Sequence, residues 1–209
     1  MTFDISKYPE PEDYGEVLLR LMASPHRRPA PVFPGVESLP DAQPGDVLIQ
    51  IGETKGHLGA SLYSREWLGL KDDELGPPPP VDLAVEKKNA DFVHSLIEQG
   101  FVNAVLDIRD GGIACAVAEM ALASGIGVAF DYCIDEPWRA FEEINGVFLL
   151  AVKRKRTDHI IDLSRQQNIH AEDLMTYFGG DEISFDTHGA LDHGWNLTLS
   201  SLREAINAG

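Results

Sequence analysis

The chain has 209 residues, of which 44% are hydrophobic and 24% charged, a composition typical of a globular protein with one solid core or two small domains. Its 34 acidic residues against 17 basic ones give a formal net charge of −17, which excludes nucleic acid and anionic membrane surfaces as first candidates for a partner. No stretch approaches the roughly 18 consecutive apolar residues of a membrane span, and the N-terminus lacks the features of a secretory leader. We therefore expect a cytoplasmic protein.

Proline and glycine interrupt residues 1–45 too often for long regular structure. One short helix is predicted there, over residues 13–23, and Pro25 ends it. Its apolar residues recur at helical spacing: Val17, Leu18, Leu21 and Met22. We expect residues 1–29 to form an N-terminal arm, with this helix and a linker, and residues 30–209 to form the main domain.

Beyond residue 45, predicted strands and helices alternate, which is typical of an α+β protein with layers of sheet and helix. Short apolar runs between turn residues predict strands at 47–51, 101–107, 126–132, 146–153, 173–178 and 182–186. Helical periodicity predicts helices at 60–68, 83–99, 113–124, 158–167 and 201–207. Asp82 is expected to cap the helix that follows it, and Ser201 with Glu204 has the spacing of a capping box.

The strongest local signal for chemistry is the turn after the predicted strand 101–107. Asp107 and Asp110 are followed directly by Gly111 and Gly112, which open a predicted helix. Backbone N–H groups of such a turn can face an anion while a carboxylate holds Mg²⁺. The alternative is a tight turn in which Asp110 caps the helix and the glycines supply positive φ angles.

Three further sets of residues have both a functional and a simpler interpretation. The glycine-containing loop 52–61 offers Lys55 and Ser61 to a phosphate, but it lacks the phosphate-loop spacing and can equally be a solvated loop. Glu119 is either a buried functional carboxylate or an exposed helix residue. Glu142 and Glu143 form either a carboxylate pair or, as we favour, a charged turn.

The seven histidines show no zinc-binding pattern. His188 and His193 lie near Asp186 and Asp192, and we do not favour a metal site there.

Several segments together resemble one family of enzymes: 45–52, 58–63, 79–83, 106–113, 118–120 and 199–205. The chain is similar over about residues 30–206 to phosphoribosylformylglycinamidine synthase, specifically to the C-terminal domain of the second half of that enzyme. This domain is shared with aminoimidazole ribonucleotide synthetase. The resemblance implies a mixed, largely antiparallel sheet covered by helices.

The resemblance also implies a function. The family transfers the amide nitrogen of glutamine to formylglycinamide ribonucleotide in purine biosynthesis, using ATP and Mg²⁺. It implies a Mg²⁺ site at Asp107 and contacts to phosphate or substrate from the turn and from the loop: Arg109, Asp110, Gly111, Gly112 and Ser61.

Two departures from the family pattern affect the turn. Leu106 and Arg109 stand where the family has histidine and serine. The ATP-handling half and the glutaminase of the enzyme are absent from this chain, so we expect it to be inactive alone and to need these parts as partners, with a homo-oligomer as a further possibility. The alternative is a non-catalytic scaffold or nucleotide-binding domain whose site has degenerated.

Overall fold

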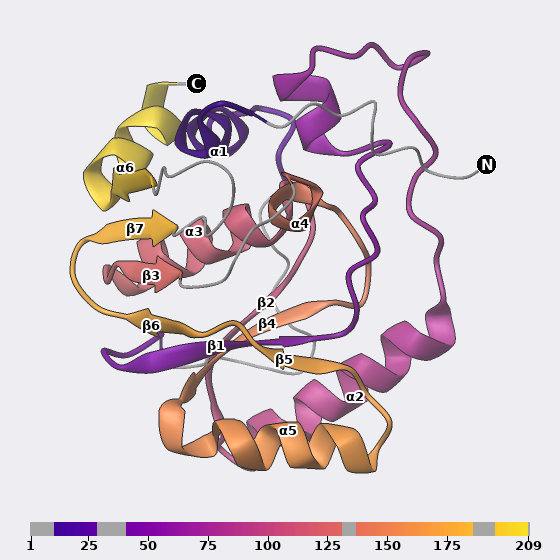
Figure 1. The fold of residues 1–209 in the computed structure, drawn as a ribbon, viewed down its shortest axis with the longest axis vertical. Coiled ribbons are helices and arrows are strands. Elements are labelled where there is room, and N and C mark those ends of the chain that lie inside the picture. Colours follow the sequence, from indigo (N-terminus) through magenta and orange to yellow (C-terminus); the bar gives the residue numbers. More distant parts are fainter. Residues whose placement is uncertain (1–10, 29–40, 131–136, 186–194, 209) are drawn as a thin grey trace.

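Two four-stranded sheets with helices packed on them form the fold (Figure 1). The computed structural model describes residues 11–28, 41–130, 137–185 and 195–208. The first sheet contains β1 (Asp46–Ile51), β2 (Val102–Asp107), β4 (Phe148–Lys153) and β5 (Ala171–Asp173), and the second contains β3 (Val128–Phe130), β6 (Thr176–Phe178), β7 (Glu182–Phe185) and β8 (Trp195–Thr198). The α-helices are α1 (Tyr14–Met22), α2 (Leu83–Glu98), α3 (Gly112–Ser124), α4 (Pro137–Phe141), α5 (Thr157–Gln166) and α6 (Leu199–Ala208). Two short helical turns, η2 (Tyr63–Trp67) and η3 (Arg154–Arg156), complete the described elements.

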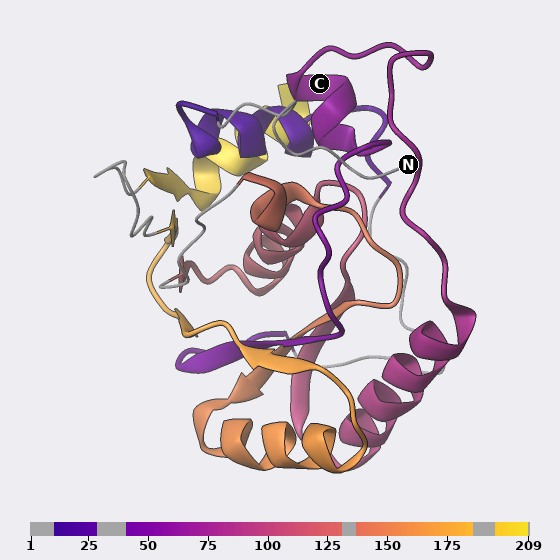
Figure 2. The same ribbon diagram turned by 45° about the vertical axis from the view of Figure 1, so that its right-hand side comes forward.

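The first sheet has the order β2-β4-β1-β5, and all of its neighbouring strands are antiparallel. Its central strands, β1 and β4, are buried on both faces, so successive side chains of β1 enter different cores. Val47 and Ile49 pack with α2 and α5, whereas Leu48 packs in the larger core with α1 and α3. Figure 2 shows α2 and α5 on one side of this sheet and α3 on the other.

The second sheet is mixed: β3 pairs with β7 in parallel, while the pairs β3 with β6 and β7 with β8 are antiparallel. The single strand predicted at 173–178 is wrong. Met175 has a φ angle of 47°, which ends β5 in the first sheet and starts β6 in the second. A residue in this left-handed conformation cannot continue an extended strand.

The helix near the N-terminus belongs to the main core. Asp13 caps α1, accepting the N–H of Gly15 at 2.8 Å, and the side chains of Leu18 and Leu21 are fully buried. This helix contacts α3 and α6. The proposed domain boundary at residue 29 stays a prediction, since residues 29–40 lie outside the described part.

The C-terminal helix begins earlier than predicted. α6 starts at Leu199, and Thr198 Oγ1 accepts the N–H of Ser201 at 3.1 Å, so the predicted capping box at Ser201 is wrong. β8 and α4 were not predicted.

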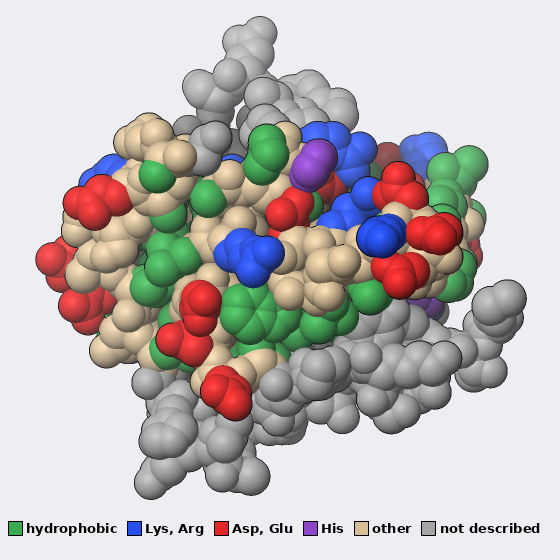
Figure 3. Space-filling view, turned by 90° about the horizontal axis from the view of Figure 1, so that it is seen from above, with side chains coloured by type: hydrophobic (Ala, Val, Ile, Leu, Met, Phe, Trp, Pro, Cys, Tyr) green, Lys and Arg blue, Asp and Glu red, His purple; other side chains and the backbone are tan. Residues whose placement is uncertain are grey.

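On the face that α1 and α6 form, acidic, basic and apolar side chains are interspersed (Figure 3).

The predicted α+β class with mixed, largely antiparallel sheet and covering helices is confirmed. None of the described helices combines the length and the apolar character needed to cross a membrane. The ends of the predicted strands 126–132 and 182–186 lie outside the described residues.

Candidate functional site

The turn between β2 and α3 has the positive φ angles that its glycine pair predicts, but the alternative in which Asp110 caps the helix is wrong, because Gly111 is the N-cap residue of α3. Gly111 and Gly112 have φ angles of 83° and 67°, which favour glycine. A Cβ at Gly112 would meet the backbone carbon of Phe141 at 2.6 Å, so the close approach of α4 also requires glycine. Ile108 fixes the start of the turn, because its N–H donates to the Val147 carbonyl at 2.8 Å and its side chain is fully buried.

An arginine pairs with each of three carboxylates around this turn. Arg109 donates to Asp107 at 2.6 Å from within the turn itself. Arg28 donates to both carboxylate oxygens of Asp110, at 2.9 and 2.8 Å, and adds its backbone N–H at 2.8 Å. Arg27 pairs with Glu119 on α3. Three guanidinium groups therefore offset these three carboxylates.

These contacts perturb the two aspartates in opposite directions. Burial raises the pKa of Asp107 despite its hydrogen bond to Arg109. Burial also acts to raise the pKa of Asp110, but the hydrogen bonds and the charge of Arg28 outweigh it and hold this pKa below its usual range. The pKa of Arg28 rises in turn, mainly through its hydrogen bond to Asp110.

Glu143 supports the turn from the loop before β4. Its Oε1 accepts the N–H of Gly111 and the N–H of Leu62, both at 2.7 Å. Burial raises the pKa of Glu143 to about 7, although both hydrogen bonds favour the ionised form. One carboxylate thus joins the turn to the neighbourhood of Ser61.

Glu142 holds the glycine-containing loop 52–61 in the same way. It is almost fully buried, and its Oε2 accepts the N–H groups of Lys55 at 2.8 Å and Gly56 at 2.5 Å. Burial raises its pKa. The favoured interpretation of a charged turn at Glu142 and Glu143 is therefore wrong, because both carboxylates accept backbone N–H groups, whereas a functional carboxylate pair stays a prediction.

The structure places the other candidate residues in different settings. Ser61 is buried, and its hydroxyl donates to the Leu58 carbonyl at 2.7 Å. Glu119 is partly buried on α3, where it pairs with Arg27. The histidines and aspartates at 186–193, where we do not favour a metal site, lie outside the described residues.

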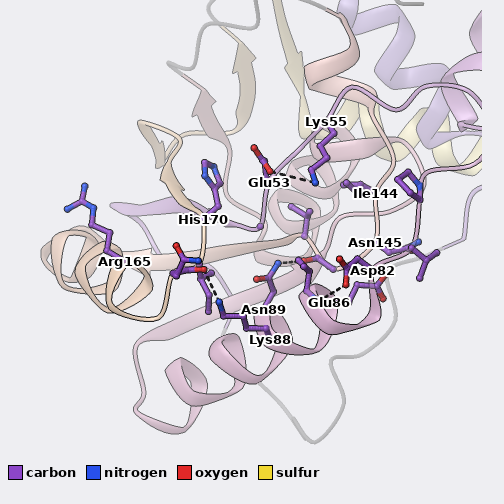
Figure 4. Close-up of a pocket in the computed structure, with 18 residues that line it drawn as sticks. Glu53, Lys55, Asp82, Glu86, Lys88, Asn89, Ile144, Asn145, Arg165 and His170 are labelled. Atoms are coloured by element: carbon purple, nitrogen blue, oxygen red, sulfur yellow. Dashed lines mark hydrogen bonds and ion pairs between the residues drawn. The ribbon is translucent and has the colours of Figure 1, made fainter. Parts of the chain in front are cut away.

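Lys55 faces a separate open cleft of about 860 Å³ between α2, α5 and the loops after β1 and before β4 (Figure 4). Its floor is closed by Asn89, whose amide donates to the Gly146 carbonyl at 2.9 Å. The charged side chains of its lining are Lys55, Lys88, Arg165, Glu53, Asp82 and Glu86. Three cations against three anions leave the cleft with no preference for one sign of ligand.

The residues around the turn do not fit a resident divalent cation. Asp107 Oδ1 is buried without a partner, as a metal ligand would be. The remaining carboxylates already bind arginines, however, and the space between these side chains is only about 10 Å³. Among the residues that the structure describes, no three His, Cys, Asp or Glu side chains gather as a metal site requires.

Comparison with known families adds a match over most of the chain. The family described as "AIR synthase related protein, C-terminal domain" matches residues 43–184. A curated relative, phosphoribosylformylglycinamidine synthase subunit PurL of Parvibaculum lavamentivorans, is 40% identical over 163 residues. The match covers 77% of this chain and 21% of the relative, so the chain spans about a fifth of that protein's length.

Solved structures share the fold at lower identity. Thermotoga maritima PurL complexed with FGAR is 18% identical, with a TM-score of 0.62, over 80% of this chain and 29% of the other. The same protein complexed with ATP is 14% identical, with a TM-score of 0.59, over 78% and 26%. PurLQS from this organism is 15% identical, with a TM-score of 0.59, over 78% and 27%. At these identities the likeness is one of fold alone.

Proposed function

Since this chain belongs to the family of the AIR synthase related protein C-terminal domain, we propose that it contributes to ATP-dependent amide transfer as a domain of a phosphoribosylformylglycinamidine synthase. The substrates of the assembled enzyme would be formylglycinamide ribonucleotide, glutamine and ATP. We place this assembly in the cytoplasm. The chain supplies one domain, and its partners supply the ATP-handling and glutaminase parts, as the PurLQS complex of a relative suggests.

One observation carries this proposal. Residues that match the family pattern lie together in a domain that matches the family over residues 43–184: Asp107, Asp110, Gly112 and Glu119 line one small space beside α3, and Gly111 is the N-cap residue of that helix. In the proposed enzyme the formamide oxygen takes the γ-phosphoryl group of ATP, ammonia from glutamine attacks the activated carbon, and phosphate leaves.

Within that assembly the turn is proposed to border the substrate or nucleotide phosphate, with Arg109 as a charged contact. Ser61 lies in the loop that Glu143 connects to the turn. ATP and Mg²⁺ belong to the complete enzyme in this proposal, and the metal ligands come from its other domains because the described residues of this chain do not fit a magnesium ion.

Complementation in trans tests the proposal. A synthase that lacks its own C-terminal domain is mixed with this chain, and formation of the amidine product is measured with ATP and either glutamine or ammonia. We expect activity only in the mixture. Asp107→Asn should reduce this activity, and the matched surface variant Asp72→Asn, at a side chain 84% exposed, should leave it unchanged.

The pairing of all three carboxylates with arginines favours a second candidate function, a scaffold domain that binds the synthase without bordering its substrate. Activity in the mixture that survives both Asp107→Asn and Asp110→Asn would support the scaffold. A mixture that stays inactive while the two proteins fail to associate would contradict both functions.

A further inference from the structure

The segment that follows α1 is fastened at its beginning to η2. Ser24 Oγ donates to Glu66 Oε1 at 2.9 Å, and His26 Nδ1 lies 2.8 Å from the same oxygen. Burial opposes ionisation of Glu66, but its hydrogen bonds with His26 and Ser24 outweigh this and hold its pKa below the usual range. The glutamate therefore anchors the start of the segment as an ion.

The end of the same segment is fastened to the glycine turn and to α3. Arg27 and Arg28 are consecutive, yet they reach different carboxylates, which lie 92 and 82 positions later in the chain: Glu119 and Asp110. The pair of Arg27 with Glu119 is sheltered, with side chains 13% and 19% exposed. Asp110 is 8% exposed, whereas the guanidinium side chain of Arg28 covers it from the surface and is 82% exposed.

We propose that three arginines take the place of a divalent cation at the glycine turn, and that Arg27 and Arg28 act as a latch that fastens residues 24–28 to it. With Arg109 on Asp107, three guanidinium groups offset three carboxylates. This inference goes beyond the proposed synthase function and does not depend on it.

The geometry explains why a cation does not displace this latch. Guanidinium groups match carboxylates through paired hydrogen bonds, and Arg28 makes two such bonds to Asp110 besides the one from its backbone. A metal ion would need the same oxygens, and it would leave Arg27 as a sheltered charge without its partner. The backbone of the turn is also engaged, because Gly111 N–H donates to Glu143 and Gly112 N–H to the Arg109 carbonyl at 2.9 Å.

Hydrogen exchange tests the latch without reference to activity. In the variant Arg27→Gln with Arg28→Gln, the amides of Ser24, His26, Arg27 and Arg28 should exchange about tenfold faster than in the wild type. The matched control replaces Arg154 and Arg165, two exposed arginines with looser carboxylate contacts, by glutamine and should leave this segment unchanged. Equal exchange in the latch variant and the wild type would overturn the latch.

The single change Arg28→Gln keeps the test decisive if the double variant fails to fold. Its side chain is mostly exposed, so the fold should persist and the segment should still exchange faster than in the control. Exchange at the wild-type rate would again contradict the latch.

Manganese, used as a paramagnetic substitute for magnesium, tests the replacement of the cation. The electron paramagnetic resonance signal of free Mn²⁺ should persist when wild-type chain is added, up to about millimolar metal. Saturable loss of the signal that Asp110→Asn abolishes would overturn the proposal. Neither hydrogen exchange nor the Mn²⁺ signal depends on synthase activity. Failure of the latch proposal is therefore distinguishable from failure of the complementation experiment.

Discussion

Glu143 lies directly beneath the glycine turn, where its Oε1 accepts the backbone N–H of Gly111 at 2.7 Å. The same oxygen accepts the N–H of Leu62, so a single carboxylate connects the turn with the loop that contains Ser61. The glycine turn and the neighbourhood of the glycine-containing loop 52–61 are thus held together by the carboxylate of Glu143.

Stability should therefore depend on the protonation of Glu143. Its pKa rises from 4.5 to about 7, so between these values the folded chain holds a proton that the unfolded chain has released. The stabilising contribution is complete below about pH 4.5 and is lost as the pH rises through 7. At about 1.4 kcal/mol for each pH unit in this range, the loss is roughly 3 kcal/mol.

Glu143→Gln should remove this dependence while keeping an oxygen that accepts both N–H groups. Urea unfolding at pH 4.5 and pH 8 should show the variant gaining about 3 kcal/mol relative to the wild type at the higher pH. The prediction is wrong if the difference in free energy of unfolding between the variant and the wild type is the same at both pH values.

Gly112→Ala should destabilise the fold by about 3 kcal/mol, since a left-handed residue gains a side chain that meets the backbone of α4. Gly125 at the other end of α3 is the matched control: its φ angle is 68°, and nothing lies within 4 Å of an added Cβ. Gly125→Ala should cost only about 1 kcal/mol. Equal losses in thermal or urea unfolding would show that the contact with α4 is unimportant.

Arg28 and Asp110 should be energetically coupled. A double-mutant cycle with Arg28→Gln and Asp110→Asn should give about 1 kcal/mol of coupling at low salt, falling in 1 M salt because Arg28 is exposed. The surface pair Arg65 and Asp72 is the control and should give less than about 0.5 kcal/mol. Coupling no larger than in the control would mean that the bidentate contact contributes nothing to the latch.

Glu142→Ala should loosen the loop 52–61. It removes the acceptor of the Lys55 and Gly56 N–H groups and leaves these donors without their buried partner, a cost of about 2 kcal/mol. Hydrogen exchange of the loop amides should accelerate, whereas the strand amides of β1 stay protected. Unchanged exchange in the loop would refute this role of Glu142.

Local patterns in the sequence predict much of this fold. The apolar run before Asp107 predicts β2, and the glycine pair after Asp110 predicts the turn and the start of α3. Each of these patterns spans only a few residues. The predicted cap at Asp82 is equally local, and its side chain accepts the N–H groups of Ala84 and Val85 at the start of α2. The family resemblance supplied the class of sheet.

Long-range contacts explain what local patterns miss. Glu142 looks like part of a charged turn because its partners, the N–H groups of the loop 52–61, lie more than 80 residues earlier in the chain. Arg27 and Arg28 look like ordinary linker charges for the same reason. The predicted strand is interrupted at Met175 because β5 pairs in the first sheet and β6 pairs in the second. A single apolar run in the sequence does not reveal that its two halves belong to different sheets.

Calorimetric titration of the purified chain shows whether its own arginines close the glycine turn and whether the chain needs partner domains to bind ligand. ATP with Mg²⁺ and formylglycinamide ribonucleotide are titrated separately. We expect no saturable heat with either ligand up to about millimolar concentration, and no ligand-induced rise in melting temperature. Saturable binding that Asp107→Ala abolishes would contradict this expectation, because the turn would then act as an open ligand site in the isolated chain.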